Sequence, residues 1–369
     1  MSLLPDADTF KSLADGSMRG PGPAALRAVL AAISVPYRGA VAIRNTAYDR
    51  ALTRVHRGPV PVISVGNLTL GGTGKTPLVA WVARTLQAAG HGPAIVSRGY
   101  GARPGEVSDE AAELAVVVPG VPHIANRDRV AAVHAAAAQG ATVVVLDDGF
   151  QHRRLARDLD IVAIDATDPF GCGRLFPRGL LREPATSLRR AQSVVLTRAS
   201  SVSAERRAEI RQAVTAASGG QLPAIWAEAT HRPVALRDRV GTLQNLERLR
   251  GRRIAAFAGI GNPAAFRATL SGLGAEVVAF TAFADHHAYH EGDIASLAAA
   301  CRQHGVDLAV TTLKDLVKFR SLDLDGIPLV ALEIAATFSE GEKLLRAAVI
   351  EAALHADPLV CAQGLDGEQ

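Results

Sequence analysis

The amino-acid sequence predicts an α/β protein whose main sheet is parallel and covered by helices on both faces. Short runs rich in β-branched residues alternate with alanine-rich helical stretches. These runs are continuously apolar, which is typical of strands that are buried on both faces. One run leads into a glycine-rich turn and then an amphipathic helix. With 369 residues, the chain is long enough for two domains.

The composition excludes several classes of protein. An apolar fraction of 48% with 21% charged residues indicates a soluble globular chain. Three widely spaced cysteines, Cys172, Cys301 and Cys361, fit a reducing cytosol better than a disulfide framework. A net charge of +4 without an aromatic stacking set argues against nucleic acid as a partner. The acidic start MSLLPDADTF does not resemble a secretory signal, and because no uninterrupted run of about 18 apolar residues occurs, we expect no membrane-spanning helix.

The first 58 residues predict a helix with an apolar stripe. Leu26, Val29, Leu30 and Ile33 recur at helical spacing. Arginines flank this stripe at positions 19, 27, 38, 44, 50, 54 and 57. An apolar stripe edged with arginine can lie in an anionic membrane interface. A helix packed on its own domain has the same periodicity, so both interpretations stay open at this point.

The strand-like runs fall into two groups. The first comprises VPVISVGN, GPAIVSRGY, ATVVVLDDG, LDIVAIDA and QSVVLTRA, and the second RRIAAFAGIG, AEVVAFTAF, VDLAVTTLKD and IPLVALEIA. The intervening PAIWAEATHRPVALRD has strand-like pieces and is interpreted as a connector. We therefore expect an N-terminal helical segment (1–58), a core domain (59–222), linker strands (223–251), a second, smaller α/β domain (252–355) and a tail (356–369).

The stretch VISVGNLTLGGTGKTPLVAW predicts a phosphate-binding loop between a strand and a helix. Backbone N–H groups of such a loop and the helix N-terminus bind phosphate. Lys75 would reach the β- and γ-phosphates, and Thr76 would bind Mg²⁺. Thr69 stands where the usual spacing has a glycine, which requires an extended conformation there. The expected nucleotide-binding residues are Thr69, Leu70, Gly71, Gly72, Thr73, Gly74, Lys75 and Thr76.

Two acidic pairs and a histidine cluster complete the candidate residues. Asp147 and Asp148 end the run VVVLDD, where a carboxylate commonly holds Mg²⁺ beside a phosphate loop. Asp109 and Glu110 follow Ser108 and, taken alone, also fit a helix cap. The segment FADHHAYHEGD has three histidines, but it lacks the spacing of a zinc site.

The collected motifs resemble one known family. VGNLTLGGTGKTP, SRGYG, SDE, NRDRV, LDDGFQHRRLARDLDIV, GRLFPRGLLREP, FAGIGNP, DHHAY and TLKDLVKF occur in the order seen in tetraacyldisaccharide 4'-kinases, the lipid A 4'-kinases of Gram-negative bacteria. The resemblance covers roughly residues 24–345. In that family the missing first glycine of the loop is usual.

The resemblance implies a P-loop kinase that uses ATP and Mg²⁺ to phosphorylate the 4'-hydroxyl of the lipid A disaccharide 1-phosphate. It implies a peripheral, monotopic enzyme on the cytoplasmic face of the inner membrane, whose N-terminal helix contacts membrane and lipid. We expect a monomer. The family's two α/β domains are joined by a β-strand linker, and closure would bring a histidine of the second domain to the catalytic aspartate.

The resemblance also implies roles for individual residues. Asp109 would be the general base on the sugar hydroxyl, with His286 as its partner and His287 as the alternative. Asp148 is the preferred Mg²⁺ ligand of the pair Asp147 and Asp148, although the sequence does not separate the two. The residues expected to contact the lipid or to complete its site are Arg129, His152, Arg182 and Glu183.

Two other functions are compatible with the phosphate loop. A kinase or synthetase acting on a soluble metabolite would not need the arginine-edged N-terminal helix. A nucleotide-dependent switch ATPase would transfer phosphate only to water. Leu70 argues against the switch, because partitioning-type ATPases carry a second lysine there.

Overall fold

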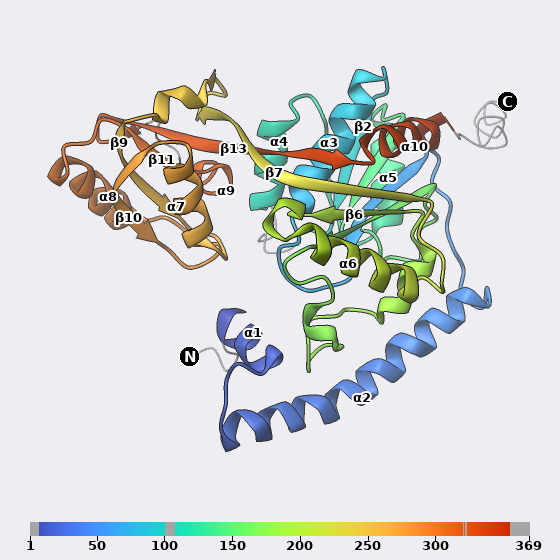
Figure 1. Ribbon diagram of the computed structural model, residues 1–369. Helices are drawn as coiled ribbons and strands as arrows, with labels where there is room; N and C mark the ends of the chain where they lie inside the picture. Colours follow the sequence, from blue (N-terminus) through green and yellow to red (C-terminus); the bar gives the residue numbers. More distant parts are fainter. Residues whose placement is uncertain (1–6, 100–107, 320, 322, 355–369) are drawn as a thin grey trace, which may run out of the picture. The chain divides into compact units, whose positions relative to one another are not determined.

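The computed structural model describes residues 7–99, 108–319, 321 and 323–354 (Figure 1). The predicted tail, Cys361 and the end of the SRGYG motif lie outside the described residues. The chain divides into two compact units, which are described separately. The first contains the described parts of 1–98, 121–231 and 336–369, and the second those of 99–120 and 232–335.

The first unit is built on a mainly parallel sheet with the strand order β13-β7-β6-β5-β1-β4-β2-β3. All pairs from β7 to β3 are parallel. Its strands are β1 (Val62–Asn67), β2 (Pro93–Ser97), β3 (His123–Ala125), β4 (Val143–Asp147), β5 (Leu159–Asp165), β6 (Ser193–Thr197) and the first parts of β7 (Ile225–Asp238) and the last of β13 (Ile327–Glu340). Because β1 lies between β5 and β4, the loop after β1 is adjacent to the end of β4.

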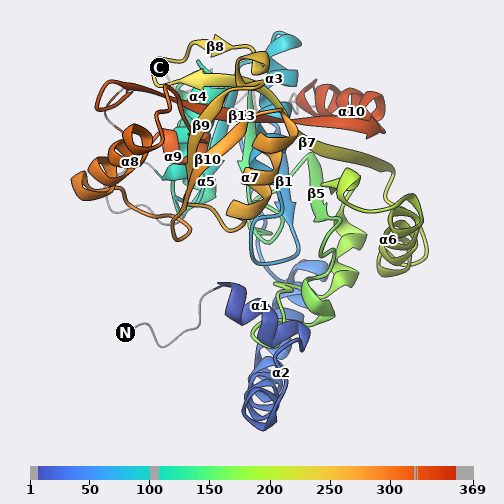
Figure 2. The ribbon, with the colours of Figure 1, turned by 60° about the vertical axis from the view of Figure 1, so that its left-hand side comes forward.

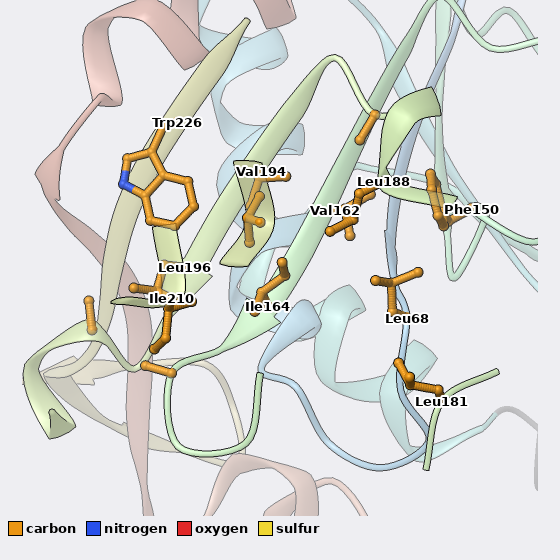
Figure 3. Packing of buried hydrophobic residues seen from close by; sticks show 14 residues of the cluster. Leu68, Phe150, Val162, Ile164, Leu181, Leu188, Val194, Leu196, Ile210 and Trp226 are labelled. Atoms are coloured by element: carbon orange, nitrogen blue, oxygen red, sulfur yellow. The ribbon is translucent and has the colours of Figure 1, made fainter. Parts of the chain in front are cut away.

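The first unit contains six helices among the described residues, and some of them pack on the sheet. The six helices are α1 (Ala7–Asp15), α2 (Pro21–Asp49), α3 (Lys75–Ala88), α5 (Arg129–Ala138), α6 (Ala204–Ala217) and α10 (Glu342–Leu354), with short 3₁₀ turns η1 (Gly171–Gly173), η2 (Ala185–Arg190) and η3 (Ala199–Ser201). The α3 and α10 helices pack on each other and on β1, and α5 packs on β2 to β4. Figure 3 shows Val162, Ile164, Val194 and Leu196 of β5 and β6 packed with Ile210 of α6. Burial on both sides explains why these strands read as continuous apolar runs.

The second unit has a smaller parallel sheet with the order β10-β9-β11-β13. It contains β9 (Arg253–Ala258), β10 (Glu276–Ala282) and β11 (Ala309–Thr312), the short strands β8 (Leu243–Gln244) and β12 (Asp323–Leu324), α4 (Asp109–Val117), α7 (Pro263–Gly272), α8 (Glu291–Gln303), α9 (Leu313–Leu316) and η4 (Leu246–Leu249). The short strands pair antiparallel with β7 and β13. The α/β class with a mainly parallel sheet is thereby confirmed.

The two units differ from the predicted segments at two places. Residues 99–120, expected in the core domain, group with the second unit because α4 packs on α9. Residues after 335 return to the first unit, because β13 continues past the predicted strand end and delivers α10 onto α3. Both β7 and β13 therefore contribute residues to each unit.

The N-terminal apolar helix is present as α2, which extends over 29 residues (Figures 1 and 2). By length and composition alone it is able to cross a membrane, and few of its residues are buried. The expectation that no helix spans a membrane stays a prediction, because length and mean hydropathy do not separate a spanning helix from one that lies along a membrane. It relied on uninterrupted apolar runs, whereas here a few arginines and small residues interrupt a helix that is apolar on average.

Candidate active site

The loop after β1 has the conformation that a phosphate-binding turn needs. The Asn67 side-chain amide donates hydrogen bonds to the Thr69 carbonyl (2.8 Å) and to Thr73 Oγ1 (3.0 Å). Thr69 forms an antiparallel bridge with Leu181, so residue 69 is extended and needs no glycine. Gly71 has a positive φ of 100°, in the left-handed region that favours glycine. The α3 helix begins directly after the loop, at Lys75.

Within the loop, Gly74 is the glycine that the packing constrains most. Its φ is 74°, and a Cβ atom placed there would lie 2.0 Å from Cε1 of His231. The same loop is held through its carbonyl groups: Arg198 donates to the Gly72 carbonyl (3.0 Å) and Thr197 Oγ1 to the Thr73 carbonyl (2.8 Å). The sequence reasoning did not predict these outer contacts.

Three charged side chains meet beside the loop. Arg182 donates to both carboxylate oxygens of Asp148, at 2.6 and 2.9 Å. Lys75 Nζ lies 3.6 Å from Asp148 Oδ1. Burial alone would raise the pKa of Asp148, but Lys75 and Arg182 outweigh that effect and lower it to about 2. Asp148 is therefore ionised and paired with two cations, Arg182 and Lys75. The sequence did not predict the pairing with Arg182.

Thr76, Asp147 and Asp148, the residues expected to hold a metal, suit Mg²⁺ better than a metal that takes all its ligands from protein side chains. Val65 of β1 is in register with Asp147 of β4, so the loop and the carboxylate pair share one edge of the sheet. Thr76 is half-buried in the first turn of α3. Among the described residues, no group of three His, Cys, Asp or Glu side chains is arranged for a metal. Mg²⁺ usually takes one or two carboxylates together with substrate phosphates and water.

Arg129 and His152 each carry a buried nitrogen atom that has no hydrogen-bond partner among the described residues. Arg129 is the first residue of α5, and its Nε makes no hydrogen bond to a described residue. The same holds for Nε2 of His152. The pKa of His152 is lowered to about 4, mainly by burial and to a smaller extent by the positive charge of Arg129. Buried polar atoms without a partner are rare in proteins, so both side chains fit a ligand with acceptor groups.

Glu183 does not share the surroundings of Arg182. It is completely buried, and its carboxylate binds Arg44 of α2 (2.5 Å) and Arg190 (2.8 Å). Asn45 adds a longer contact of 3.4 Å. Arg182 therefore contacts Asp148, whereas the adjacent Glu183 contacts α2. The two residues, which were expected to form one site pair, have different partners.

The second unit contains the Asp109 site. Asp109 is the first residue of α4, capped by Ser108, whose side chain accepts from Ala111 N at 3.3 Å. His286 Nδ1 lies 3.0 Å from Asp109 Oδ2, although the two residues are 177 positions apart. His286 itself has a φ of 60°, an uncommon value for a residue with a side chain.

His287 has a different environment. Its Nε2 lies 2.9 Å from Asp293 Oδ2, and its ring stacks on Phe283 with a centroid separation of 4.6 Å. The geometry thus joins Asp109 to His286 and not to His287. The expectation that domain closure would bring His286 to Asp109 is wrong, because both residues belong to the second unit and are already in contact.

Sequence reasoning missed several residues of these sites. Lys314 contacts His286 and Lys318 contacts Asp109, whereas Arg198 binds a carbonyl group of the phosphate loop and His231 packs against Gly74. One signal was present for the lysines: the chain has only five, at positions 11, 75, 314, 318 and 343. Three of the five lie at the two candidate sites.

Comparisons with known proteins show which family the chain is similar to. A model of the family LpxK, tetraacyldisaccharide-1-P 4'-kinase, matches residues 26–353. A tetraacyldisaccharide 4'-kinase of Syntrophus aciditrophicus is 42% identical over 340 residues, covering 85% of this chain and 91% of the relative. That of Anaeromyxobacter sp. (strain K) is 42% identical and covers 91% and 92%. The crystal structure of LpxK from Aquifex aeolicus in complex with ATP has a TM-score of 0.70 at 30% identity, covering 89% of this chain and 99% of that one.

Proposed function

The chain belongs to the tetraacyldisaccharide-1-P 4'-kinase family, and from this premise we propose how its own residues perform the reaction. The protein is a kinase of lipid A biosynthesis that transfers phosphate from ATP to the 4'-hydroxyl of tetraacyldisaccharide 1-phosphate. The observation that carries the proposal is the pairing of Asp109 with His286, because a carboxylate oriented by an imidazole is a general base for a hydroxyl.

The first unit provides the phosphate-donor side. Residues 69–76 would hold the ATP phosphates through the loop backbone and the N-terminus of α3, with Lys75 at the β- and γ-phosphates. Its present contact with Asp148 keeps the ammonium at the loop. Thr76 and the Asp147–Asp148 pair, with Asp148 preferred, would hold Mg²⁺, which neutralises phosphate charge when bound. Phosphoryl transfer depends mainly on such positioning and charge neutralisation.

The second unit provides the base. Asp109 would take the proton of the 4'-hydroxyl as the hydroxyl oxygen attacks the γ-phosphorus. His286 would keep the carboxylate pointed at that hydroxyl. Transfer occurs when both sets of residues act on one ATP molecule and one lipid.

Arg129 and His152 would contact the sugar phosphate of the lipid. Their unpartnered buried nitrogens support this role, because acceptor oxygens of the lipid would satisfy them. Arg182 would orient Asp148. Glu183 would act indirectly, by anchoring α2 through Arg44.

The exposed surface of α2 supports attachment to a membrane. One row of the helix is docked: Tyr37 donates to the Arg182 carbonyl (2.9 Å), Val41 is buried and Arg44 binds Glu183. The adjacent row exposes Leu26, Val29, Ile33 and Ile43, each between 45% and 73% exposed. We propose that this apolar row lies in the cytoplasmic face of the inner membrane, so that a peripheral, monomeric enzyme reaches a lipid substrate.

The reaction is tested with radiolabelled ATP, Mg²⁺ and tetraacyldisaccharide 1-phosphate in mixed micelles, with Lys75→Ala as control. Labelled lipid in the wild-type sample alone is the expected result. Label that appears only as free phosphate contradicts the kinase and favours a switch ATPase. Transfer to a soluble metabolite and not to the lipid would favour the other kinase.

The membrane proposal is tested by vesicle sedimentation. Replacing Leu26, Val29 and Ile33 with glutamine should reduce binding to anionic vesicles without lowering the thermal stability, because these side chains are exposed. The control replaces Val234 with glutamine, since this apolar residue is also 45% exposed but lies on β7. Equal binding of all three proteins would contradict a role of α2 at the membrane.

A further inference from the structure

Lys318 places a positive charge directly beside the carboxylate of Asp109, the proposed general base. Its Nζ lies 3.1 Å from Asp109 Oδ2, 3.1 Å from the His287 carbonyl oxygen and 3.5 Å from Asp315 Oδ1. A lysine ammonium has three N–H donors, and each has an acceptor here. The side chain is only 12% exposed, so the protein rather than water determines its position.

Asp315 holds Lys318 in this position. Asp315 is fully buried, and its Oδ2 accepts hydrogen bonds from Gly259 N (2.9 Å) and from Thr312 Oγ1 (2.7 Å). These contacts keep Oδ1 directed at Lys318. The Tyr289 ring adds a further contact, with its centroid 5.8 Å from the ammonium nitrogen. Lys318 is therefore part of a rigid framework and not a mobile surface lysine.

Lys314 contacts the other side of the histidine. Its Nζ lies 2.9 Å from Asp285 Oδ1 and 3.1 Å from His286 Nε2. An ammonium group only donates, so Nε2 must accept. The single ring proton of a neutral His286 is then on Nδ1, which faces Asp109 Oδ2 at 3.0 Å.

We infer that Lys314 and Lys318 are positioning residues for the Asp109 base. Lys314 selects the tautomer in which His286 donates to Asp109, and Lys318 binds the same carboxylate oxygen. Both contacts converge on Oδ2, and Oδ1 makes no hydrogen bond to any residue that the structure describes. Oδ1 is thereby reserved for the acceptor hydroxyl. This inference rests on the proposed function, because that hydroxyl belongs to the lipid.

The arrangement determines where the proton goes. As the hydroxyl oxygen bonds to the γ-phosphorus, the bond from that phosphorus to the bridging oxygen breaks and its electron pair stays on ADP. The hydroxyl proton passes to Oδ1 of Asp109. His286 keeps its one proton throughout, because Lys314 occupies the lone pair of Nε2. His286 therefore orients the base and does not relay the proton.

Nitrogen-15 NMR of the full-length protein labelled at histidine tests the role of Lys314 without any substrate. The His286 signals are assigned by comparison with His286→Gln. We expect the wild type to be protonated at Nδ1, and Lys314→Met to show a mixture of tautomers. Wild-type protonation at Nε2, or an unchanged tautomer in Lys314→Met, would overturn this role.

Steady-state kinetics test both lysines. Lys314→Met and Lys318→Met should each lower kcat by roughly 10²-fold and leave the KM for ATP within about twofold, because a misdirected base affects the chemical step. Lys343→Met is the matched control, since Lys343 is exposed on α10, and it should behave as wild type. An unchanged kcat in either variant overturns the role of that lysine.

Lys318 is also part of the packing, so a second variant separates the two effects. Lys318→Gln keeps hydrogen-bonding capacity toward Asp315 but removes the charge. A folded Lys318→Gln protein, shown by an unchanged thermal midpoint and ATP affinity, should still lose kcat; full activity in it would overturn the proposal. If the proposed function is wrong, the wild-type protein forms no labelled lipid. The nitrogen-15 NMR measurement of the His286 tautomer needs no substrate, so it tests the role of Lys314 separately.

Discussion

Asp148 in the first unit and Asp109 in the second are both carboxylates beside cations, but they are held in different ways. Arg182 binds both oxygens of Asp148, at 2.6 and 2.9 Å. The contacts to Asp109 converge on Oδ2 alone within the described residues. A carboxylate with both oxygens bound serves as an anchor, whereas one with a reserved oxygen is suited to accept a proton. The distribution of neighbours over the two oxygens therefore distinguishes a binding residue from a base.

The two sites also differ in how the chain builds them. Residues of the phosphate loop are consecutive, and its shape follows from backbone conformations at Gly71 and Gly74. The Asp109 site joins the start of α4, the loop that carries His286, and the segment of α9 and Lys318, mainly through side chains. The first site is local and the second is assembled over long distances in the sequence.

The largest effect is expected from the local site. Lys75→Ala should lower kcat/KM by about 10³-fold or more, since the β- and γ-phosphates lose their principal cation. The loss should exceed that of Arg129→Ala or His152→Ala, measured in the labelled-lipid assay. A smaller loss for Lys75→Ala than for either lipid contact would contradict the assignment of the donor site.

The next test compares the two carboxylates directly. Asp109→Asn should lower kcat by about 10²–10⁴-fold with little change in KM, because it removes the base. Asp148→Asn should also weaken ATP binding, because Arg182 and Lys75 lose their partner. Separate kcat and KM values for ATP and lipid check this. Near-normal kcat in Asp109→Asn would dismiss Asp109 as the base, and identical profiles for both variants would remove the distinction drawn above.

Stability tests show whether the local site depends on its backbone. Gly74→Ala should lower the free energy of unfolding by about 3 kcal/mol, because alanine is strained at this φ and its Cβ overlaps His231. Gly72→Ala is the control, since no atom lies within 4 Å of its Cβ position and its φ is not positive. Urea unfolding without nucleotide gives both values. Equal losses would mean that the contact with His231 does not constrain the loop.

The smallest expected effects are on stability against pH, and His152 in the first unit and Glu113 in the second should respond in opposite directions. The pKa of His152 is lowered from 6.5 to about 4, so its contribution is complete above pH 6.5 and is lost as the pH falls toward 4. Burial raises the pKa of Glu113 in α4 from 4.5 to about 7, so its protonated form is favoured and stability is lost as the pH rises from 4.5 through 7. A shift of this size corresponds to at most about 3.5 kcal/mol, and the contribution of the partly exposed His152 is smaller because solvent screens its charge.

Urea unfolding at pH 5 and pH 8 checks these directions. His152→Gln should reduce the loss of stability at pH 5, and Glu113→Gln should reduce the loss at pH 8. A variant whose pH dependence equals that of the wild type would exclude its residue as the source.

Much of the fold and of the donor site was predictable from sequence, because the signals are local. Apolar runs predicted the main parallel strands, and a strand, glycines and Lys75 in succession predicted the phosphate loop. The extended conformation of Thr69 also agrees with the structure. Strand β3 and the full lengths of β7 and β13 were not predicted, because short or partly exposed strands have weaker patterns.

The sequence by itself therefore determined the α/β class, the phosphate loop and the apolar N-terminal helix, since each depends on residues within a few positions of one another. Only the tertiary structure decided that His286 rather than His287 meets Asp109, that Arg182 binds Asp148, and that Glu183 is buried against α2. It also decided the place of Lys318. The physical reason is that such contacts depend on side chains from distant segments, and nothing in the local pattern of either segment specifies its partner.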